Sequence, residues 1–310
     1  SRTLLAIAAV IVEDNVPGGG LNNGTYGSSP TSIIDVAGTT YFVATDSVNG
    51  TELWRINRSG VAELVEDAIP GGGLGSTSSQ PESLTNVNGT LYFVTKNSLA
   101  NTHKLLWRVN GTGTAELVPN AISGSGVKPE IHFNAQPLLT VVDGTLYFSA
   151  ATNVSSTNLW RVNRFGFTEL VDNATRAFGF YPQALTNVNG TLYFQANDQT
   201  NGAELWRIDR SGTVEMVEDA VPGGGIRPGS ASSSPTAFSN VNGTLYFQAN
   251  DGTNGVELWR INTSGFAEMV EDNIPGGGIN PFGANAYPTN LTNVGGTLYF
   301  SAVSFLSGRE

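Results

Sequence analysis

Short runs of alternating apolar and polar residues, separated by Gly, Asn, Pro and Ser, extend along the whole chain. The segment 236–271 shows the pattern, because its four runs (236–241, 244–249, 257–262 and 266–271) are separated by Asn-Gly, Asp/Asn/Gly-rich and Ser-Gly sequences. A period of two is typical of strands with one buried face, and Asn-Gly between two such runs predicts a hairpin. This segment therefore predicts four short antiparallel strands.

The same pattern recurs along the sequence. A Gly-Thr-Leu-Tyr-Phe motif, with one Thr-for-Leu change, begins at Gly38, Gly89, Gly144, Gly190, Gly243 and Gly296. A Leu-Trp-Arg motif places tryptophans at Trp54, Trp107, Trp160, Trp206 and Trp259, with spacings of 53, 53, 46 and 53 residues. Four short strands in each repeat of this length are the sequence signature of a β-propeller.

We therefore predict an all-β chain that forms a single six-bladed β-propeller with four antiparallel strands per blade, in one domain over residues 1–310. In repeat coordinates the C-terminus stops one residue before the N-terminus begins, so the sixth blade is expected to be closed by segments from both ends. The expected blades cover approximately 28–70, 79–122, 133–174, 180–221, 233–274, and 286–310 together with 1–16.

The N-terminal segment departs from the repeat. Leu5-Ala6-Ile7 stands where the first expected blade has the Arg58-Ser59-Gly60 turn, so residues 3–12 form one continuous apolar run. We expect this run to be a closure strand of its own ring, or an assembly strand that completes the ring of a neighbouring molecule and propagates as a filament. The residues proposed for this role are Leu4, Leu5, Ile7, Val10, Ile11 and Val12.

Composition and charge exclude several classes of function. The net charge is −11, which disfavours nucleic acid as a partner, and no apolar run reaches the roughly 18 residues of a spanning helix, so membrane insertion is not expected. With no Cys there is no disulfide framework or thiolate metal site. The two histidines, His103 and His132, are not accompanied by a pattern that indicates a catalytic triad or a zinc site.

The residues Glu-Leu-Trp-Arg, after a Gly-rich turn and before a Ser-Gly turn and Val-Glu-Asp, resemble the Glu-Leu-Trp repeats of certain bacterial surface and secreted proteins. The best examples are 250–265 and 197–212, while 101–104 and 155–158 lack the Gly turn and the Glu. The resemblance covers essentially the whole chain. It implies a propeller with an extracellular or cell-surface location and no established activity.

Two further expectations concern residues that recur in every Leu-Trp-Arg unit. The tryptophans are expected to pack between blades, because a buried indole contributes a large apolar area. Each Arg is followed eight residues later by a Glu, and a three-residue hairpin loop would place the two opposite each other as a cross-strand ion pair. The pairs are Arg55–Glu63, Arg108–Glu116, Arg161–Glu169, Arg207–Glu215 and Arg260–Glu268.

Three turns between the second and third strands bring Asp, Asn and Glu close together in sequence. These oxygen ligands suit calcium, but their spacing differs from that of a calcium-binding loop, and we interpret the turns mainly as strand connections. They lie on the face that carries the longer loops, where recognition is expected. The candidate ligand-binding residues are Asp46, Asn49, Glu52, Asp198, Asn201, Glu204, Asp251, Asn254 and Glu257.

Glycosylation sequons are abundant in the turns. They occur at Asn23, Asn49, Asn57, Asn88, Asn110, Asn153, Asn173, Asn189, Asn242, Asn262 and Asn290. Asn-Gly-Thr is also the ordinary chemistry of a hairpin turn, so the pattern alone fits both a glycoprotein and an unmodified chain.

The sequence contains no pattern that indicates an active site, so we predict a protein that is not an enzyme and uses no cofactor. The first hypothesis is a non-enzymatic extracellular structural or adhesive propeller, with itself, glycans or another surface protein as partner. The alternative is a lectin-like carbohydrate-binding propeller with equivalent pockets in several blades. A third hypothesis, a hydrolase with a central acidic cluster, would require unmatched carboxylates in the first strands, where Asp35 and Asp143 are candidates.

Overall fold

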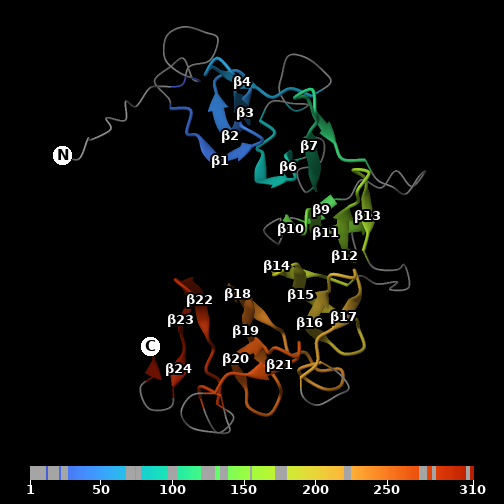
Figure 1. Ribbon diagram of the computed structural model, residues 1–310, viewed down its shortest axis with the longest axis vertical. Helices are drawn as coiled ribbons and strands as arrows, with labels where there is room; N and C mark the ends of the chain where they lie inside the picture. Colours follow the sequence, from blue (N-terminus) through green and yellow to red (C-terminus); the bar gives the residue numbers. More distant parts are fainter. Residues whose placement is uncertain are drawn as a thin grey trace, which may run out of the picture. The chain divides into compact units, whose positions relative to one another are not determined.

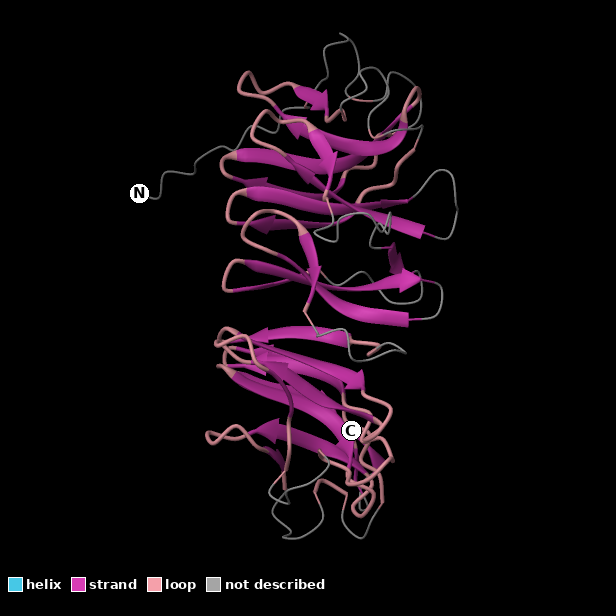
Figure 2. Cartoon of the chain, turned by 90° about the vertical axis from the view of Figure 1, so that its right-hand side faces the viewer, coloured by secondary structure: helices cyan, strands magenta, loops and turns pink. Residues whose placement is uncertain are grey.

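The computed structural model describes residues 12, 21, 27–67, 74, 78–96, 103–119, 130–132, 139–153, 156–171, 180–219, 225–271, 278–280, 284–304 and 308–310. Figure 1 labels the strands along the chain, and Figure 2 shows that strands and loops make up the described part of the structure, without a helix. Contacts divide the chain into two compact units, 1–119 with 128–133, and 120–127 with 134–310. In the described part there is accordingly no helix that could cross a membrane.

The first unit contains two blades. The first blade is a sheet of β1 (Thr31–Val36), β2 (Thr39–Asp46), β3 (Gly50–Ile56) and β4 (Ala62–Leu64), in that order. The second blade consists of β5 (Glu82–Val87), β6 (Thr90–Lys96), β7 (His103–Val109) and β8 (Ala115–Leu117), and β9 (Glu130–His132) pairs with β7. All these pairings are antiparallel.

The second unit repeats the same arrangement. The third blade consists of β10 (Thr140–Val142), β11 (Thr145–Asn153), β12 (Ser156–Val162) and β13 (Thr168–Leu170). The fourth blade consists of β14 (Gln183–Val188), β15 (Thr191–Asn197), β16 (Ala203–Ile208) and β17 (Val214–Met216). The fifth blade consists of β18 (Thr236–Val241), β19 (Thr244–Asn250), β20 (Val256–Ile261) and β21 (Ala267–Met269). β22 (Thr289–Val294) pairs with β23 (Thr297–Ser301), and β24 (Val303–Ser304) with β25 (Gly308–Arg309).

The prediction of an all-β chain built from four-stranded antiparallel sheets is confirmed, with β-propeller blades as the repeating unit. The expected ranges in the fifth blade agree with the observed strands within one or two residues, except that the fourth strand has only three residues. The expected Asn-Gly hairpins are present. Asn242 and Gly243 have φ values of 50° and 81°, which is the two-residue turn geometry that matches the twist of the flanking strands.

The core lies at the seams between consecutive blades. One cluster joins Leu53 of the first blade to Phe93 and Trp107 of the second. Another joins Leu205 of the fourth blade to Trp259 of the fifth. Trp107, Trp206 and Trp259 thus pack between blades as the sequence predicted, and burying these aromatic side chains stabilises the neighbouring blades.

A row of asparagines also links consecutive blades. The amide Nδ2 of Asn240 donates to the main-chain oxygen of Asn187 in the preceding blade at 3.2 Å, and Asn293 donates in the same way to Asn240 at 3.1 Å. Asn187 donates to Val141 at 2.8 Å. The Oδ1 atom of Asn240 accepts the N–H of Gly243 at 3.0 Å, so one side chain closes its own hairpin and binds the preceding blade.

Of the residues proposed for the N-terminal closure strand, Leu4, Leu5, Ile7, Val10 and Ile11 lie outside the described residues. Val12 is described and is exposed. Among the described residues at the other end of the chain, Tyr299 and Val294 on β23 and β22 are more than half exposed, whereas the equivalent Tyr193 and Val188 in the fourth blade are buried.

Candidate functional site

The Asp and Asn of the candidate turns bind each other. In the fifth blade Oδ1 of Asp251 accepts the N–H of Asn254 at 2.7 Å, and Oδ2 accepts its Nδ2 at 2.6 Å. Asp198 and Asn201 form the same two bonds, both at 2.7 Å, and Asp46 and Asn49 repeat the pairing. These carboxylates therefore hold their own turns.

The glutamates of the same turns point into the protein instead. Glu52, Glu204 and Glu257 are fully buried. Glu204 accepts hydrogen bonds from the N–H and the hydroxyl of Ser233 at 2.8 and 2.6 Å, and from the N–H of Ile226 at 3.0 Å. Each glutamate thus binds main-chain N–H groups of the loop that follows its blade, away from the Asp and Asn of its turn.

Burial sets the protonation of these glutamates. It raises the pKa of Glu52 and Glu204, although hydrogen bonds from Ser79 and Ser233 partly offset the effect. Burial raises the pKa of Glu257 to about 7. Hydrogen bonds from the N–H groups of Ile279, Asn280 and Ala286 act in the opposite direction, and the negative charge of Asp251 raises the pKa further. Among the described residues, no group of three or more His, Asp or Glu side chains is placed to hold a metal ion.

The structure places a different feature, a polar cleft, at the seams. The blade 4/5 cleft has a volume of about 630 Å³ and lies between the β14–β15 hairpin and the fifth blade. It is lined by Val188, Asn189, Thr191, Tyr193, Gly243, Thr244, Leu245, Tyr246, Arg260, Ile261, Asn262, Thr263, Ser264, Gly265 and Glu268. It opens on the face of the Asn-Gly and Ser-Gly turns, opposite the face on which the sequence predicted recognition.

A second cleft occupies the related place in the first unit. The blade 1/2 cleft has a volume of about 580 Å³, and its walls are the β1–β2 hairpin, the turn between β3 and β4, and the turn between β7 and β8. Tyr41, Arg55 and Glu63 of the first blade line it, whereas Tyr246, Arg260 and Glu268 of the fifth blade line the blade 4/5 cleft. A smaller cleft of about 280 Å³ in the third blade contains Arg161 and Glu169.

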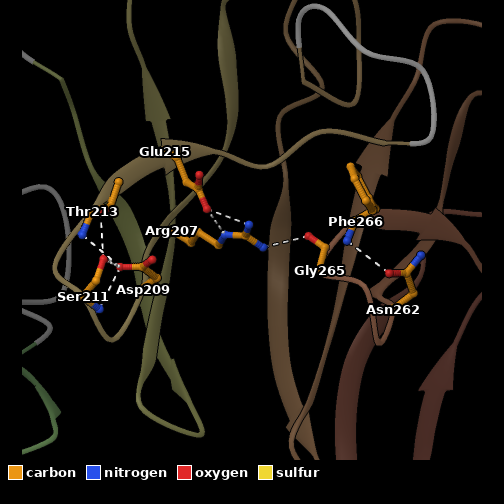
Figure 3. A network of polar contacts seen from close by, with 8 residues as sticks. All are labelled: Arg207, Asp209, Ser211, Thr213, Glu215, Asn262, Gly265 and Phe266. Carbon is orange, nitrogen blue, oxygen red and sulfur yellow. Dashed lines mark hydrogen bonds and ion pairs between the residues drawn. The ribbon is translucent and has the colours of Figure 1, made fainter.

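Three of the predicted Arg–Glu pairs, those of Arg55, Arg161 and Arg260, line these clefts. Register places each Arg opposite its Glu on the third and fourth strands, and all five pairs have N–O separations of 2.5 to 2.7 Å. In the fourth blade, Arg207 also reaches across the seam, where its Nη1 donates to the carbonyl of Gly265 at 2.8 Å (Figure 3). Arg55 does the same to Gly113 at 2.9 Å.

The turn that presents Gly265 is held by an asparagine. Oδ1 of Asn262 accepts the N–H groups of Ser264 and Phe266 at 3.0 and 3.1 Å, and the bond to Phe266 is drawn in Figure 3. Gly265 has φ +83°, and a Cβ there would lie 2.7 Å from Nη1 of Arg207. The sequence signal for this contact is the Asn-x-x-Gly spacing of residues 262–265, of which we had interpreted only the Ser-Gly part, as a turn.

The side chains of several sequon asparagines form hydrogen bonds within the protein. The amide nitrogens of six sequon asparagines donate to protein oxygens, namely Asn49, Asn57, Asn110, Asn189, Asn242 and Asn262. Asn23 and Asn173 lie outside the described residues. Glycosylation of these asparagines stays a prediction. The two histidines are opposite each other in the register of β7 and β9.

Of the three comparisons with known proteins, only that with solved structures gives matches. No protein-family model matches the chain, and no curated protein sequence matches it. Among solved structures, a prolyl endopeptidase is similar at 13% identity and a TM-score of 0.49, over 89% of this chain and 38% of that one. Puromycin hydrolase follows at 14% identity and 0.43, over 98% and 55%, and dipeptidyl peptidase 4 of Porphyromonas gingivalis at 11% and 0.48, over 85% and 40%. The chain spans about two fifths to just over half of the length of these proteins.

These neighbours contradict two predictions from the sequence. They are enzymes, whereas we predicted a protein that is not an enzyme and a non-enzymatic extracellular structural or adhesive role. The prediction failed because the repeated motifs describe a scaffold, and one scaffold supports many functions. We therefore withdraw the structural and adhesive role and the exclusion of enzymes. At these identities the likeness shows the fold alone.

Proposed function

We propose that this chain is a β-propeller binding domain whose seam clefts bind short peptides. The observation that carries the proposal is the recurrence of a polar cleft beside an Arg–Glu pair, once in each compact unit. The volumes of about 630 and 580 Å³ lie within the range of small-ligand sites in proteins.

The chemistry of the cleft walls favours a peptide over a sugar. Asn262, Thr263 and Ser264 offer donors and acceptors side by side, and a peptide presents N–H and C=O groups in the same alternation. A sugar site commonly offers the face of an aromatic ring. Tyr41 and Tyr193 line the clefts with only 7% of their surface exposed, so their faces are packed in the core, and of the lining tyrosines only Tyr246 is partly exposed.

A blocking variant tests the proposal. Thr263 is exposed on the rim of the blade 4/5 cleft, and Thr263→Trp would fill the opening without entering the core. Thr253→Trp is the matched control, because Thr253 is an exposed turn residue at the opposite end of the same blade. Isothermal titration with tri- and tetrapeptides is expected to show one site fewer in Thr263→Trp and an unchanged number in Thr253→Trp.

Equal binding by the two variants, or no binding of any peptide to the wild-type chain, would contradict the proposal. Mass spectra of the same mixtures measure whether a bound peptide is cleaved. Cleavage would add a reaction to the binding proposed here.

We also propose that the ring has six blades and that residues 1–16 supply the last strand of the sixth. Register supports this proposal. Ala302 and Glu310 exchange two main-chain hydrogen bonds of 2.9 Å, and Ala249 and Glu257 occupy the same paired positions in the fifth blade. β25 thus corresponds to the start of a third strand. Class averages from electron microscopy would count the blades, and a number other than six would contradict the proposal.

A further inference from the structure

Two arginines of the repeat close the seam that follows their own blade. Arg207 donates from Nη1 to the carbonyl of Gly265 in the fifth blade at 2.8 Å (Figure 3), and Arg55 donates in the same way to Gly113 in the second blade at 2.9 Å. A Cβ on either glycine would lie 2.7 Å or less from Nη1. The guanidinium at this position of the repeat therefore binds a carbonyl oxygen of the next blade.

Arg161 in the third blade lacks this bond. Its Nε donates to Oε1 of Glu169 at 2.7 Å, and its guanidinium also bonds the hydroxyl of Tyr147, so both partners belong to the third blade. The equivalent glycine of the next blade is Gly212, in a turn whose residues are all described. Gly212 is exposed, and no atom from elsewhere in the described chain lies within 4 Å of its Cβ position. The side chain of Arg161 is 38% exposed, compared with 24% for Arg207.

The third and fourth blades are nevertheless packed together along their first strands. Nδ2 of Asn187 in the fourth blade donates to the carbonyl of Val141 in the third at 2.8 Å. At the fourth strand, Val214 is partly exposed. Its counterparts in the other blades are at most 2% exposed, namely Ala62, Ala115, Thr168 and Ala267. The space beside Arg161 is therefore a local gap at the outer end of a seam that is otherwise closed.

A cleft lies on this side of the third blade. The blade 3 cleft has a volume of about 280 Å³, and its polar lining consists of Thr145, Arg161, Asn163, Arg164 and Glu169. The counterparts of its charged residues are Arg55, Arg58 and Glu63, which form the first-blade wall of the blade 1/2 cleft. Since Arg55 reaches the second blade from that wall, the blade 3 cleft opens toward the fourth blade.

The blade 3 cleft carries more positive than negative charge. Glu169 is its one carboxylate, and the two oxygens of Glu169 are bound by Nε of Arg161 and, at 2.8 Å, by Nδ2 of Asn163. Arg164 has no carboxylate partner among the residues that the structure describes, and its guanidinium carbon lies 4.7 Å from the ring centre of Phe165. Phe165 is 68% exposed and adds apolar surface to the cleft. These groups suit an anion with a small apolar part.

We infer that the blade 3 cleft binds a carboxylate group through Arg161, in the place that a main-chain carbonyl takes in the equivalent seams. A carboxylate offers the same kind of oxygen with a negative charge, and charge-assisted hydrogen bonds to a guanidinium are the stronger ones. The net charge of −11 disfavours a dianion such as phosphate.

The size of the cleft limits the ligand. A volume of about 280 Å³ is at the lower end for small-ligand sites, so the carboxylate belongs to a small organic acid or to the last residue of a peptide. The inference goes beyond the proposed function, because it concerns a third cleft and does not depend on peptide binding at the other two.

Two pairs of probes test the inference by titration calorimetry. N-acetylphenylalanine and its amide represent a peptide end, and benzoate and benzamide represent a small free acid. The wild-type chain is expected to bind the acid of at least one pair roughly 10- to 100-fold more tightly than the amide, as a charge-assisted bond predicts. Arg161→Gln should abolish this preference, and Arg161→Lys should retain part of it. Arg207→Gln is the matched control, because Nη1 of Arg207 is already bound to Gly265, and it should leave the preference unchanged.

Each outcome supports or overturns the inference. A preference for N-acetylphenylalanine identifies a peptide end as the ligand, a preference for benzoate identifies a free acid, and both support the site when Arg161→Gln removes them. Equal affinity within both pairs, absence of binding, or a preference that survives Arg161→Gln overturns it. The peptide titrations of Thr263→Trp are unaffected by that failure, so the two proposals fail separately.

A second measurement covers the case in which Arg161→Gln does not fold, which thermal melts would show. In the wild-type chain, the Nε–H resonance of Arg161 in the nuclear magnetic resonance spectrum should shift on addition of the acid and stay in place on addition of the amide. An unchanged resonance with saturating acid would overturn the inference without any variant.

Discussion

The main-chain N–H of Ala286 donates to Oε1 of Glu257 at 3.1 Å, at a position where the two equivalent glutamates meet a serine. Ser79 and Ser233 donate both an N–H and a hydroxyl to Glu52 and Glu204. Glu257 therefore lacks the hydroxyl donor that Glu52 and Glu204 have. This difference is consistent with the pKa of about 7, because burial is opposed there by main-chain N–H groups alone.

The first prediction concerns pH. Glu257 has a folded pKa of about 7 against an ordinary value of 4.5, so the folded state holds this proton more tightly than the unfolded state. The contribution of Glu257 to stability is thus greatest below pH 4.5, decreases as the pH rises to 7, and is constant above. The total change is on the order of 3 kcal/mol.

Urea unfolding of the wild-type chain and of Glu257→Gln, from pH 4 to pH 8, measures this contribution as a difference between the two proteins. Other titrating groups cancel in that difference. A difference that does not vary with pH would show that Glu257 has the same pKa in the folded and unfolded states, and would contradict the prediction.

The second prediction is that Ala286→Ser stabilises the protein above pH 7. A hydroxyl at residue 286 would reproduce the contacts of Ser233, lower the pKa of Glu257, and add about 1 kcal/mol or more of hydrogen-bond energy to the ionised form. Unfolding free energies at pH 5 and pH 8 measure the effect, which should be larger at pH 8. Loss of stability at both values would mean that the buried site has no room for the oxygen.

The third prediction concerns a glycine beside a buried carboxylate. Gly225 has φ +85°, and a Cβ there would lie 2.6 Å from Oε2 of Glu204. Gly229 has φ +87° with no atom within 4 Å of its Cβ position, so it isolates the backbone cost. Gly225→Ala should destabilise the protein by about 1 to 3 kcal/mol, and by more than Gly229→Ala. Equal losses in thermal melts would show that the carboxylate moves aside freely.

The fourth prediction separates the two roles of the seam asparagines. Asp35 occupies the equivalent position in the first blade and caps Gly38 at 3.2 Å, so Asn240→Asp should keep the hairpin and lose the bond to the fourth blade. Asn240→Ala loses both. We expect about 1 kcal/mol for Asn240→Asp and roughly twice that for Asn240→Ala, measured by chemical denaturation. An unchanged stability in Asn240→Asp would show that the seam bond contributes nothing.

Much of the blade could be predicted because its determinants are local. The alternation of residues 236–241 and the Asn-Gly turn after them define a hairpin without reference to other blades. The eight-residue spacing from Arg207 to Glu215 is also sufficient to pair them, since register follows from the length of the turn.

The candidate site depended on contacts that the sequence does not encode locally. Glu204 directly follows a polar turn, at the start of β16, and its donors come 22 and 29 residues later, so its burial could not be inferred from its neighbours. Asn187 likewise donates to a carbonyl 46 residues earlier, a partner that its neighbours in the sequence do not indicate. The clefts likewise arise between blades, where the pattern within one repeat gives no information.

The asparagine row has a consequence for how such a chain can change in length. Each asparagine binds a main-chain oxygen of the blade before it, and a main-chain oxygen is present whatever the side chain. A duplicated or transplanted blade would therefore find its acceptor without any compensating substitution in its new neighbour. After duplication of a blade, the hydrogen bond from asparagine to the main-chain oxygen would form again without further substitutions. The number of blades can therefore evolve separately from the residues that line the clefts.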